Sequence, residues 1–203
     1  MFVTTSPART RLSPEARRAQ LLELGARLFA TRSVDEISID VLAEEAGVSR
    51  GLMYHYFGSK QDFRLAVIRH AVEDLVEKTA PPAEGEPIDR LLISLGVYVD
   101  YVLANLTLYR SLVRAAAGGT DEIRALYETG RFALTDRIFR EDAQGQILKD
   151  TPQSRLVVRG WSAMTEEMVL TWADDPSVMT REELLGVLAL SLPALVATSL
   201  PDE

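Results

Sequence analysis

The chain has 203 residues, 47% of them hydrophobic and none of them cysteine, so it can bury a sizeable core but holds no disulfide or thiolate metal site. It has no run of eighteen apolar residues and no signal-peptide core, so we expect a soluble cytoplasmic protein with no membrane partner. The net charge of −8 is uneven: residues 1–64 carry nine basic and eight acidic side chains, and residues 65–203 carry thirteen and twenty-two, so the acidity does not exclude DNA binding by the first part.

The N-terminal segment is polar and basic. We expect residues 1–12 to form a disordered arm. Basic side chains there could neutralise DNA phosphates, although solvated basic tails are as common, so contact of the arm with DNA stays open. The basic cluster comprises Arg9, Arg11, Arg17 and Arg18. Ser13 and Pro14 then begin a first helix, since Pro occupies a position that needs no N–H donor, and this helix should end near Thr31.

Two short helices joined by a tight turn are predicted next. Ser38 can cap the first of them, because its hydroxyl accepts a backbone N–H that the first turn leaves unpaired. Apolar residues recur after it at helical spacing, and Gly47 follows, a residue type that adopts a positive φ at little cost. Ser49 provides a second cap two residues later. A helix–glycine turn–helix of this size is the unit that lays its second helix in a DNA major groove.

The second of these helices divides its residues by face. Met53 and Phe57, four apart, should pack inward with Val48. The other side chains point outward, where Arg50 can pair with guanine and Leu52 can contact a thymine methyl group. Tyrosine and histidine side chains can donate to phosphates, and a glycine lets the backbone approach the DNA. The DNA-binding candidates are Ser38, Ser49, Arg50, Gly51, Leu52, Tyr54, His55, Tyr56 and Lys60.

A fourth helix is predicted from about Ser59 to Lys78. Ser59 and Asp62 have the spacing of a capping box. Lys60 lies in the first turn, where it and the unpaired N–H groups could hold a phosphate. The proline-rich stretch over residues 81–87 then breaks the chain and is the best domain boundary.

The stretch from Leu42 to Phe63 resembles the N-terminal domain of the TetR family of bacterial transcriptional regulators, and the similarity extends over roughly residues 11–71. The matching positions are Leu42, Ala43, Ala46, Gly47, Val48, Ser49, Tyr54, Phe57, Ser59 and Lys60. Leu52 departs from the family, where that position is more often small or hydroxylated. The resemblance implies an all-α fold of about nine helices, with a helix-turn-helix domain at residues 13–80 and a ligand-binding and dimerisation domain at residues 81–203.

The pattern after the boundary is wholly helical, without strand alternation or an internal repeat. Apolar spacing predicts one long helix from Ile88 through Leu106, a shorter one from Leu108 to Ala117, and one capped by Thr120 that runs to about Asp142. A further helix should run from about residue 153 to 172. The last one begins at residue 180, with an acidic residue at its capping-box position.

Aromatic and methionine side chains gather in this second part, the region that binds a small effector in the TetR family. Such a stripe is more often plain core than a ligand site, so the residues alone leave both interpretations open. The ligand-binding candidates are Tyr98, Tyr101, Val102, Tyr109, Arg110, Leu126, Phe132, Trp161 and Met164.

The last helix has too many apolar residues for a single buried face, so we expect intramolecular packing on one side and a second subunit on the other. These residues are Leu184, Leu185, Val187, Leu188, Leu190, Leu192, Leu195 and Val196. Two such helices from each chain would form a four-helix homodimer interface, as in the family, and a two-fold dimer suits a palindromic DNA site.

The leading hypothesis is a DNA-binding repressor that a small-molecule effector releases from a palindromic operator. An all-helical enzyme is the least favoured alternative, because the two histidines have no metal-ligand spacing and no catalytic, metal or cofactor motif occurs. A helical protein-interaction module is the other alternative, which the outward arginine and tyrosines disfavour. The sequence does not identify the effector, the operator or the regulated genes.

Overall fold

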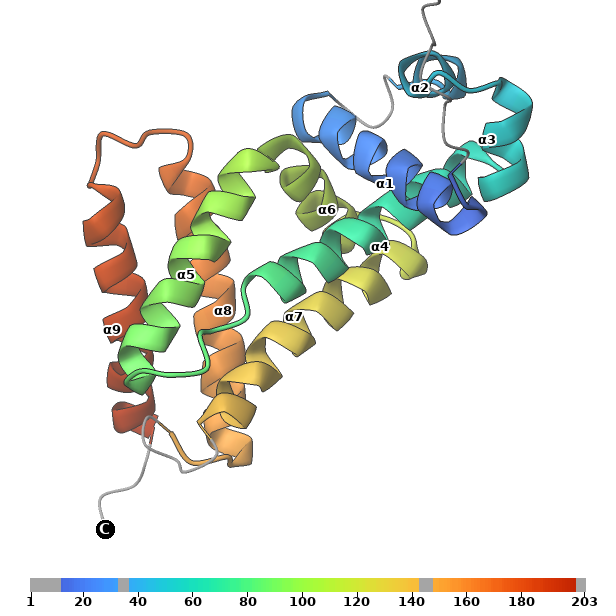
Figure 1. The fold of residues 1–203 in the computed structure, drawn as a ribbon. Coiled ribbons are helices and arrows are strands. Elements are labelled where there is room, and N and C mark those ends of the chain that lie inside the picture. The colour runs from blue at the N-terminus through green and yellow to red at the C-terminus, as the bar shows by residue number, and fades with distance from the viewer. Residues whose placement is uncertain (1–11, 33–36, 143–147, 200–203) are drawn as a thin grey trace, which may run out of the picture.

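The computed structural model describes residues 12–32, 37–142 and 148–199, and these residues form nine α-helices without a strand (Figure 1). The predicted all-α fold is thus confirmed. Of the arm expected over residues 1–12, only Leu12 lies within the described part of the chain.

The first four helices are α1 (Pro14–Thr31), α2 (Ile39–Ala46), α3 (Arg50–Phe57) and α4 (Lys60–Lys78). Figure 1 shows α1, α2 and α3 gathered around one end of the long α4. Their shared core is built on large apolar side chains that are almost fully buried, among them Phe29, Leu42, Met53, Phe63 and Val67. Because Leu108, Leu112 and Ile123 belong to the same cluster, the first helices are packed firmly onto the second part of the chain.

The second part comprises α5 (Pro87–Ala104), α6 (Leu106–Gly118), α7 (Asp121–Glu141), α8 (Pro152–Trp172) and α9 (Arg181–Ser199). Its core lies between α5, α8 and α9 and includes Val99, Val158, Leu188 and Leu192. The Trp161 indole N–H ties α8 to α9 by donating to the Leu188 carbonyl (2.9 Å). In Figure 1, α9 forms the side of the molecule farthest from α1 to α3.

The two helices predicted over Ile88–Leu106 and Leu108–Ala117 are both present, but the first ends two residues earlier than predicted, at Ala104, and the chain bends by 94° between α5 and α6. Asn105 interrupts the helix: its side-chain N–H donates back to the Tyr101 carbonyl (2.9 Å), and its backbone leaves helical geometry with φ −122° and ψ 28°. Asparagine favours such local bonds over continuing a helix. A new helix therefore begins at Leu106, two residues before the predicted start.

The predicted helix starts are otherwise close to those observed. At the start of α9, the Glu183 carboxylate accepts from the Thr180 backbone N–H (2.7 Å), and the Thr180 hydroxyl accepts from the Glu183 backbone N–H (3.2 Å), as a capping box requires. Thr120 occupies the N-cap position of α7, but its side chain makes no capping hydrogen bond, so that part of the prediction is wrong.

None of the described helices is by itself long and apolar enough to cross a membrane. The α5 and α6 pair reaches that length and composition only jointly, across the sharp bend at Asn105.

Candidate nucleic-acid interface and ligand cavity

Three small residues set the angle between α2 and α3. The Ser38 hydroxyl accepts from the Val41 backbone N–H (3.2 Å) and so caps α2. Gly47 ends α2 in the left-handed region, at φ 62°, where a side chain would be strained. The Ser49 hydroxyl accepts from the Leu52 backbone N–H (3.2 Å) and caps α3. Ser38 and Ser49, both DNA-binding candidates, thus have a structural role as the caps of α2 and α3.

One face of α3 is anchored in the protein and the other faces solvent. Met53 and Phe57 are buried as predicted. The exposed residues of the helix are Arg50, Gly51, Tyr54 and His55. Leu52 and Tyr56 are only half-buried, since each adjoins the Met53 and Phe57 stripe, and the Tyr56 ring lies 6.3 Å from the Phe57 ring.

Arg50 is held from two sides. One guanidinium nitrogen lies 3.3 Å from an Asp40 carboxylate oxygen on α2, and another lies 3.5 Å from the Tyr54 hydroxyl. The Tyr54 hydrogen bond, followed by the Asp40 carboxylate, raises the pKa of Arg50 above its ordinary value. Asp40 was not predicted, because nothing in the sequence shows that a residue ten positions before Arg50 lies beside it across the turn.

Lys60 stands at the exposed start of α4, next to the exposed face of α3. The serine cap before it is confirmed: the Ser59 hydroxyl accepts from the Asp62 backbone N–H (3.1 Å) and donates to the Asp62 carboxylate (2.6 Å). The capping box is incomplete, because the Ser59 backbone N–H donates to the Phe57 carbonyl (2.8 Å) and not to Asp62. Arg18 of α1 lies nearby, with its guanidinium 5.4 Å from the centre of the Phe57 ring.

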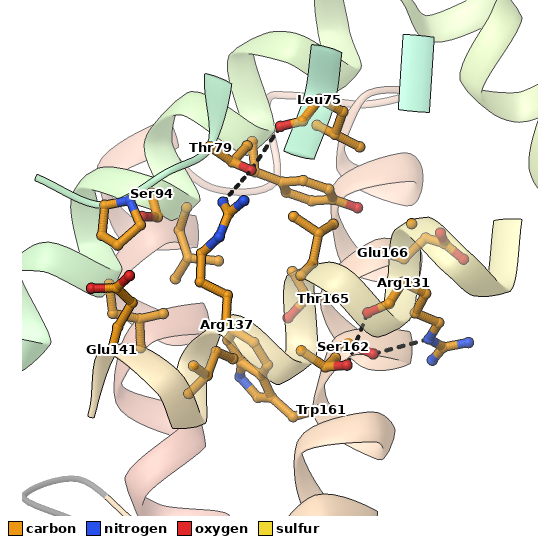
Figure 2. A pocket seen from close by; sticks show the side chains of 18 of the residues that line it. Leu75, Thr79, Ser94, Arg131, Arg137, Glu141, Trp161, Ser162, Thr165 and Glu166 are labelled. Atoms are coloured by element: carbon orange, nitrogen blue, oxygen red, sulfur yellow. Dashed lines mark hydrogen bonds between the residues drawn. The ribbon is translucent and has the colours of Figure 1, made fainter. Parts of the chain in front are cut away.

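A cavity of about 160 Å³ lies among the helices of the second part, lined chiefly by α4, α5, α7 and α8. Its walls are mostly apolar, and polar groups gather in two places (Figure 2). In Figure 2, Arg131 and Glu166 lie together on one side, and Glu141 and Ser94 lie on the other.

Tyrosines and one carboxylate form a hydrogen-bonded chain at the Glu166 side. Glu166 accepts from the hydroxyls of Tyr109 (2.9 Å) and Tyr127 (2.8 Å), and the Tyr98 hydroxyl lies 2.8 Å from that of Tyr109. Arg131 donates to Tyr127 (3.4 Å). Burial raises the pKa of Tyr127 to about 12 and raises the pKa values of Tyr98 and Tyr109 as well, so these phenols stay protonated and can donate.

Two arginines line the cavity toward its Glu141 side. Arg90 pairs with the Glu141 carboxylate and donates to the Pro82 carbonyl (2.7 Å). Arg137 reaches back to α4, where it contacts the Thr79 hydroxyl (3.4 Å) and the Val76 carbonyl (2.5 Å). Burial, followed by the nearby charge of Arg140, lowers the pKa of Arg137. Glu141 is exposed, which places this side of the cavity near the surface.

Three of the nine ligand-binding candidates line the cavity: Tyr98, Tyr109 and Trp161. Tyr101 instead donates to the Ala71 carbonyl of α4 (2.9 Å), and Arg110 pairs with Asp174 (2.6 Å). Phe132 is 59% exposed on α7. The remaining three lie in or against the hydrophobic cores, and they are Val102, Leu126 and Met164.

The exposed side of α8 and α9 carries large apolar residues. Leu156 is 72% exposed and Leu190 65%, and Val187 and Leu195 are also exposed. Of the apolar residues predicted on two sides of the last helix, the buried ones are Leu184, Leu185, Leu188, Leu192 and Val196. The prediction of two apolar sides on α9 is therefore confirmed.

Two family descriptions match this arrangement. Residues 21–67 match the bacterial regulatory proteins of the tetR family, and residues 87–192, about half of the chain, match the tetracyclin repressor-like C-terminal domain.

The chain belongs to the TetR family of bacterial regulatory proteins.

Known members of the TetR family resemble the chain over most of its length. A crystal structure of a tetR-family transcriptional regulator from Streptomyces coelicolor superposes with a TM-score of 0.81 at 34% identity, covering 93% of this chain and 83% of that one. The transcriptional activator FasR of Mycolicibacterium smegmatis is 25% identical over 81% of this chain and 76% of its own length. The repressor KstR2 of Mycobacterium tuberculosis is 34% identical, but over only 34% of this chain and 38% of its own length.

The chain is therefore a TetR-family transcriptional regulator with an N-terminal DNA-binding helix-turn-helix domain and a C-terminal helical domain. These matches give no support to the enzyme and protein-interaction alternatives. FadR of Bacillus subtilis, whose structure was determined in complex with stearoyl-CoA, has the same fold (TM-score 0.66), but it is only 16% identical and covers 90% of this chain and 99% of that one.

Within this TetR-family fold, the polar residues of the cavity are the ones that sequence reasoning missed. Glu166, Arg131 and Arg137 were not among the candidates, although Arg131 follows Tyr127 by four positions and so shares its helix face. That spacing is the only signal the sequence contains. It does not indicate that this face of α7 meets Glu166 of α8.

Proposed function

We propose that the chain is a repressor that binds a palindromic operator as a homodimer and is released by a small-molecule effector. The proposal rests chiefly on α3, whose inner side chains Met53 and Phe57 are buried while Arg50, Tyr54 and His55 remain exposed. An anchored helix with an arginine at its exposed N-terminal end suits insertion into the major groove.

In this proposal some residues of α3 contact bases and others contact phosphates. Arg50 pairs with a guanine, and Leu52 contacts a thymine methyl group from its half-buried position. Tyr54, His55 and Lys60 donate to phosphates, which fixes the register of the helix on the duplex. Gly51 is exposed, so the backbone can approach the DNA there. Tyr56 is less accessible and contributes at most through its hydroxyl.

We assign the second copy to the exposed apolar side of α8 and α9. Leu156, Val187 and Leu190 are large apolar residues exposed on these two helices, and a partner surface there would bury them. The small exposed residues Gly160 and Ala163 follow Leu156 at helical spacing on α8 and would let two helices approach closely. A two-fold axis through this surface would place two copies of α3 on successive half-sites.

The effector would act on DNA affinity through α4. Val72, Leu75 and Thr79 of α4 line the cavity, and the same helix packs against α1 and α3 near its other end. Two contacts couple α4 to the cavity walls: Tyr101 donates to the Ala71 carbonyl, and Arg137 contacts Thr79. A ligand that binds one position of α4 more tightly than another changes the affinity of the protein for DNA. DNA then changes the affinity of the protein for the ligand by the same factor.

The boundary between the DNA-binding domain at residues 13–80 and the ligand-binding and dimerisation domain at residues 81–203 is part of this proposal. The loop after α4 supports it, because α4 ends at Lys78 and α5 begins at Pro87. The core that α1 and α4 share with α6 keeps the two domains in fixed contact, as transmission of a signal requires.

Selection of bound fragments from the genome of the source bacterium tests the proposal. The full chain should retain a small set of fragments at roughly 150 mM salt, where non-specific phosphate contacts are strongly screened. Those fragments should share two half-sites related by a two-fold axis. Retention of all fragments alike, or of none, would show that the chain is not a sequence-specific regulator of this kind.

A further inference from the structure

The charged groups that line the cavity are balanced in sign and occupied with protein partners. Three arginines and three acidic residues contribute to the lining. Glu166 accepts two phenol hydroxyls, and Arg90 pairs with Glu141. Asp142 accepts from the Leu148 backbone N–H (2.9 Å). A ligand with a net charge would therefore upset the balance of charge in a mostly apolar space.

The two remaining arginines are held by neutral oxygens. Arg131 donates to the Ser162 hydroxyl (3.0 Å) and the Arg159 carbonyl (3.0 Å), in addition to Tyr127. Arg137 is held by the Thr79 hydroxyl and the Val76 carbonyl. These contacts use three of the five N–H donors of Arg131 and two of the five of Arg137, and they direct both guanidinium groups toward protein oxygens.

Two neutral hydroxyls of the lining, in contrast, have no partner among the residues that the structure describes. They are the buried Ser94 Oγ and Thr165 Oγ1, and Thr165 as a whole is only 4% exposed. Figure 2 places Thr165 between Arg137 and Glu166, and Ser94 on the side of Glu141. A buried hydroxyl without a hydrogen bond costs free energy, which a ligand oxygen could recover.

Hydroxyls on other helices of the protein make a hydrogen bond that Thr165 lacks. Thr79, Ser111, Thr129 and Thr135 each donate to the carbonyl four residues earlier, at 2.7 to 2.9 Å. This is the usual solution for a hydroxyl within a helix. Thr165 makes no such bond, so its hydroxyl is available for another partner after a rotation about the Cα–Cβ bond.

We propose that the effector, if the proposed function holds, is a neutral and mainly apolar molecule whose hydroxyl or carbonyl oxygen hydrogen-bonds to Thr165, with Ser94 as a second polar contact. The volume of about 160 Å³ accommodates such a molecule, because a cavity of roughly 150 Å³ already binds benzene. Tyr98, whose hydroxyl can donate to Tyr109, keeps oxygen lone pairs that could accept from a ligand hydroxyl.

Three probes of equal chain length test the charge of the ligand: 1-octanol, octanoate and octylammonium, each titrated calorimetrically into the full chain without DNA. The alcohol should bind at least roughly tenfold more tightly than either ion, because only the ions must give up the hydration of a charge to enter a mostly apolar site whose lining charges balance. Equal or tighter binding of either ion, or binding of none of the three, would overturn the proposal. Octanoate binding that is lost in Arg137→Gln would show instead that the cavity takes an anion.

Substitutions of similar shape test the contact itself. Thr165→Val should weaken 1-octanol binding roughly five- to tenfold, the equivalent of one hydrogen bond, and should raise the melting temperature of the protein without probe. Thr135→Val is the matched control: it also lines the cavity, but its hydroxyl donates to the Arg131 carbonyl, so it should leave octanol binding unchanged and not raise the melting temperature. Unchanged octanol binding in Thr165→Val would contradict the inference.

Failure of this inference and failure of the proposed function can be told apart, because the titrations contain no DNA. A chain that selects operator fragments but prefers octanoate is a regulator with another class of effector. A chain that prefers 1-octanol through Thr165 but selects no DNA has the ligand site without the proposed function.

Discussion

Arg50 is the side chain on which base recognition depends most directly. Asp40 and Tyr54 hold its guanidinium at the outer edge of the turn. Both members of the ion pair are more than half exposed, so the pair adds little to stability. It does limit the orientations of the arginine before DNA binds, and this lowers the side-chain entropy lost on docking.

Arg50→Ala should therefore weaken operator binding by about 1–3 kcal/mol and relax the preference at one base pair in each half-site. The fold should be retained, because the side chain is exposed. Gel shifts with an operator series mutated at each position measure both effects. An unchanged preference at every position would assign base reading to another residue.

Lys60→Ala provides the contrasting case, since a phosphate contact carries no sequence information. Affinity for operator and for unrelated DNA should fall by the same factor, and the slope of log affinity against log salt should decrease by about one. A selective loss at the operator would show that Lys60 reads a base.

Two tyrosines allow the same chemical change to be compared at an exposed and a buried position. Tyr54→Phe should change the free energy of unfolding by less than about 0.5 kcal/mol, because Tyr54 is exposed, yet it should lower DNA affinity. Tyr109→Phe should cost about 1–3 kcal/mol, because it removes a donor from the enclosed Glu166. Denaturant unfolding of both variants measures the difference, and a large loss in Tyr54→Phe would identify that residue as core.

At the scale of single residues, those that could be predicted are the ones whose role depends on local spacing in the sequence. Met53, Phe57 and the capping serines follow from helix periodicity and chain-local hydrogen bonds. Asp40, Glu166 and Arg137 act through partners on other helices, and no local pattern identifies such partners. Phe132 shows the opposite error: an aromatic residue chosen for the pocket is exposed on α7.

At the scale of elements, the existence and most boundaries of the described helices could be predicted, because nearly every helix starts at a hydroxyl cap or a proline. The break between α5 and α6 was predicted between Leu106 and Leu108 rather than at Asn105, since Leu106 continues the apolar spacing of the preceding helix. A single residue, Asn105, causes the bend. Its type alone does not predict a bend, because many helices continue through an asparagine despite its tendency to bond to the backbone.

The contact between α4 and α7 depends on a residue without a side chain. A Cβ atom at Gly130 would lie 2.6 Å from a methyl carbon of Val72, too close for either helix to keep its position. Gly130→Ala should thus cost about 1–3 kcal/mol in thermal or denaturant unfolding. It should also alter the effect of the effector on DNA binding, since Val72 lines the cavity.

The double variant Val72→Ala with Gly130→Ala is the test of that cause, because it restores the space and should recover most of the lost stability. Gly118→Ala serves as a control, as nothing lies within 4 Å of its position, and it should change stability by less than about 1 kcal/mol. If the stability losses of the two single substitutions add up in the double variant, the close contact with Val72 is not the reason that position 130 requires glycine.

Over the whole molecule, charge and apolar surface are separated in a way that fits the proposed function. The near-neutral first part carries the exposed face of α3, and the strongly acidic second part encloses the cavity. Helix α9, which carries the exposed Val187, Leu190 and Leu195, lies away from α1 to α3 (Figure 1). An acidic second part repels DNA, so phosphate contacts are confined to the helix-turn-helix end.

The proposed dimer surface can be tested without disturbing the core, because Leu190 is 65% exposed whereas its neighbours Leu188 and Leu192 are buried. Leu190→Glu should give a folded chain with the monomer mass of 22.5 kDa in light scattering, since a carboxylate on each copy would meet its own counterpart near the two-fold axis. Operator affinity should fall by at least roughly a hundredfold, because one half-site is then bound without the linked second one. Ile93→Glu on α5, which is 53% exposed outside the α8 and α9 surface, should leave both mass and affinity unchanged. A Leu190→Glu chain that keeps the mass of a dimer would require the second copy to bind another face, and the spacing of the two α3 helices would then have to be derived from that face.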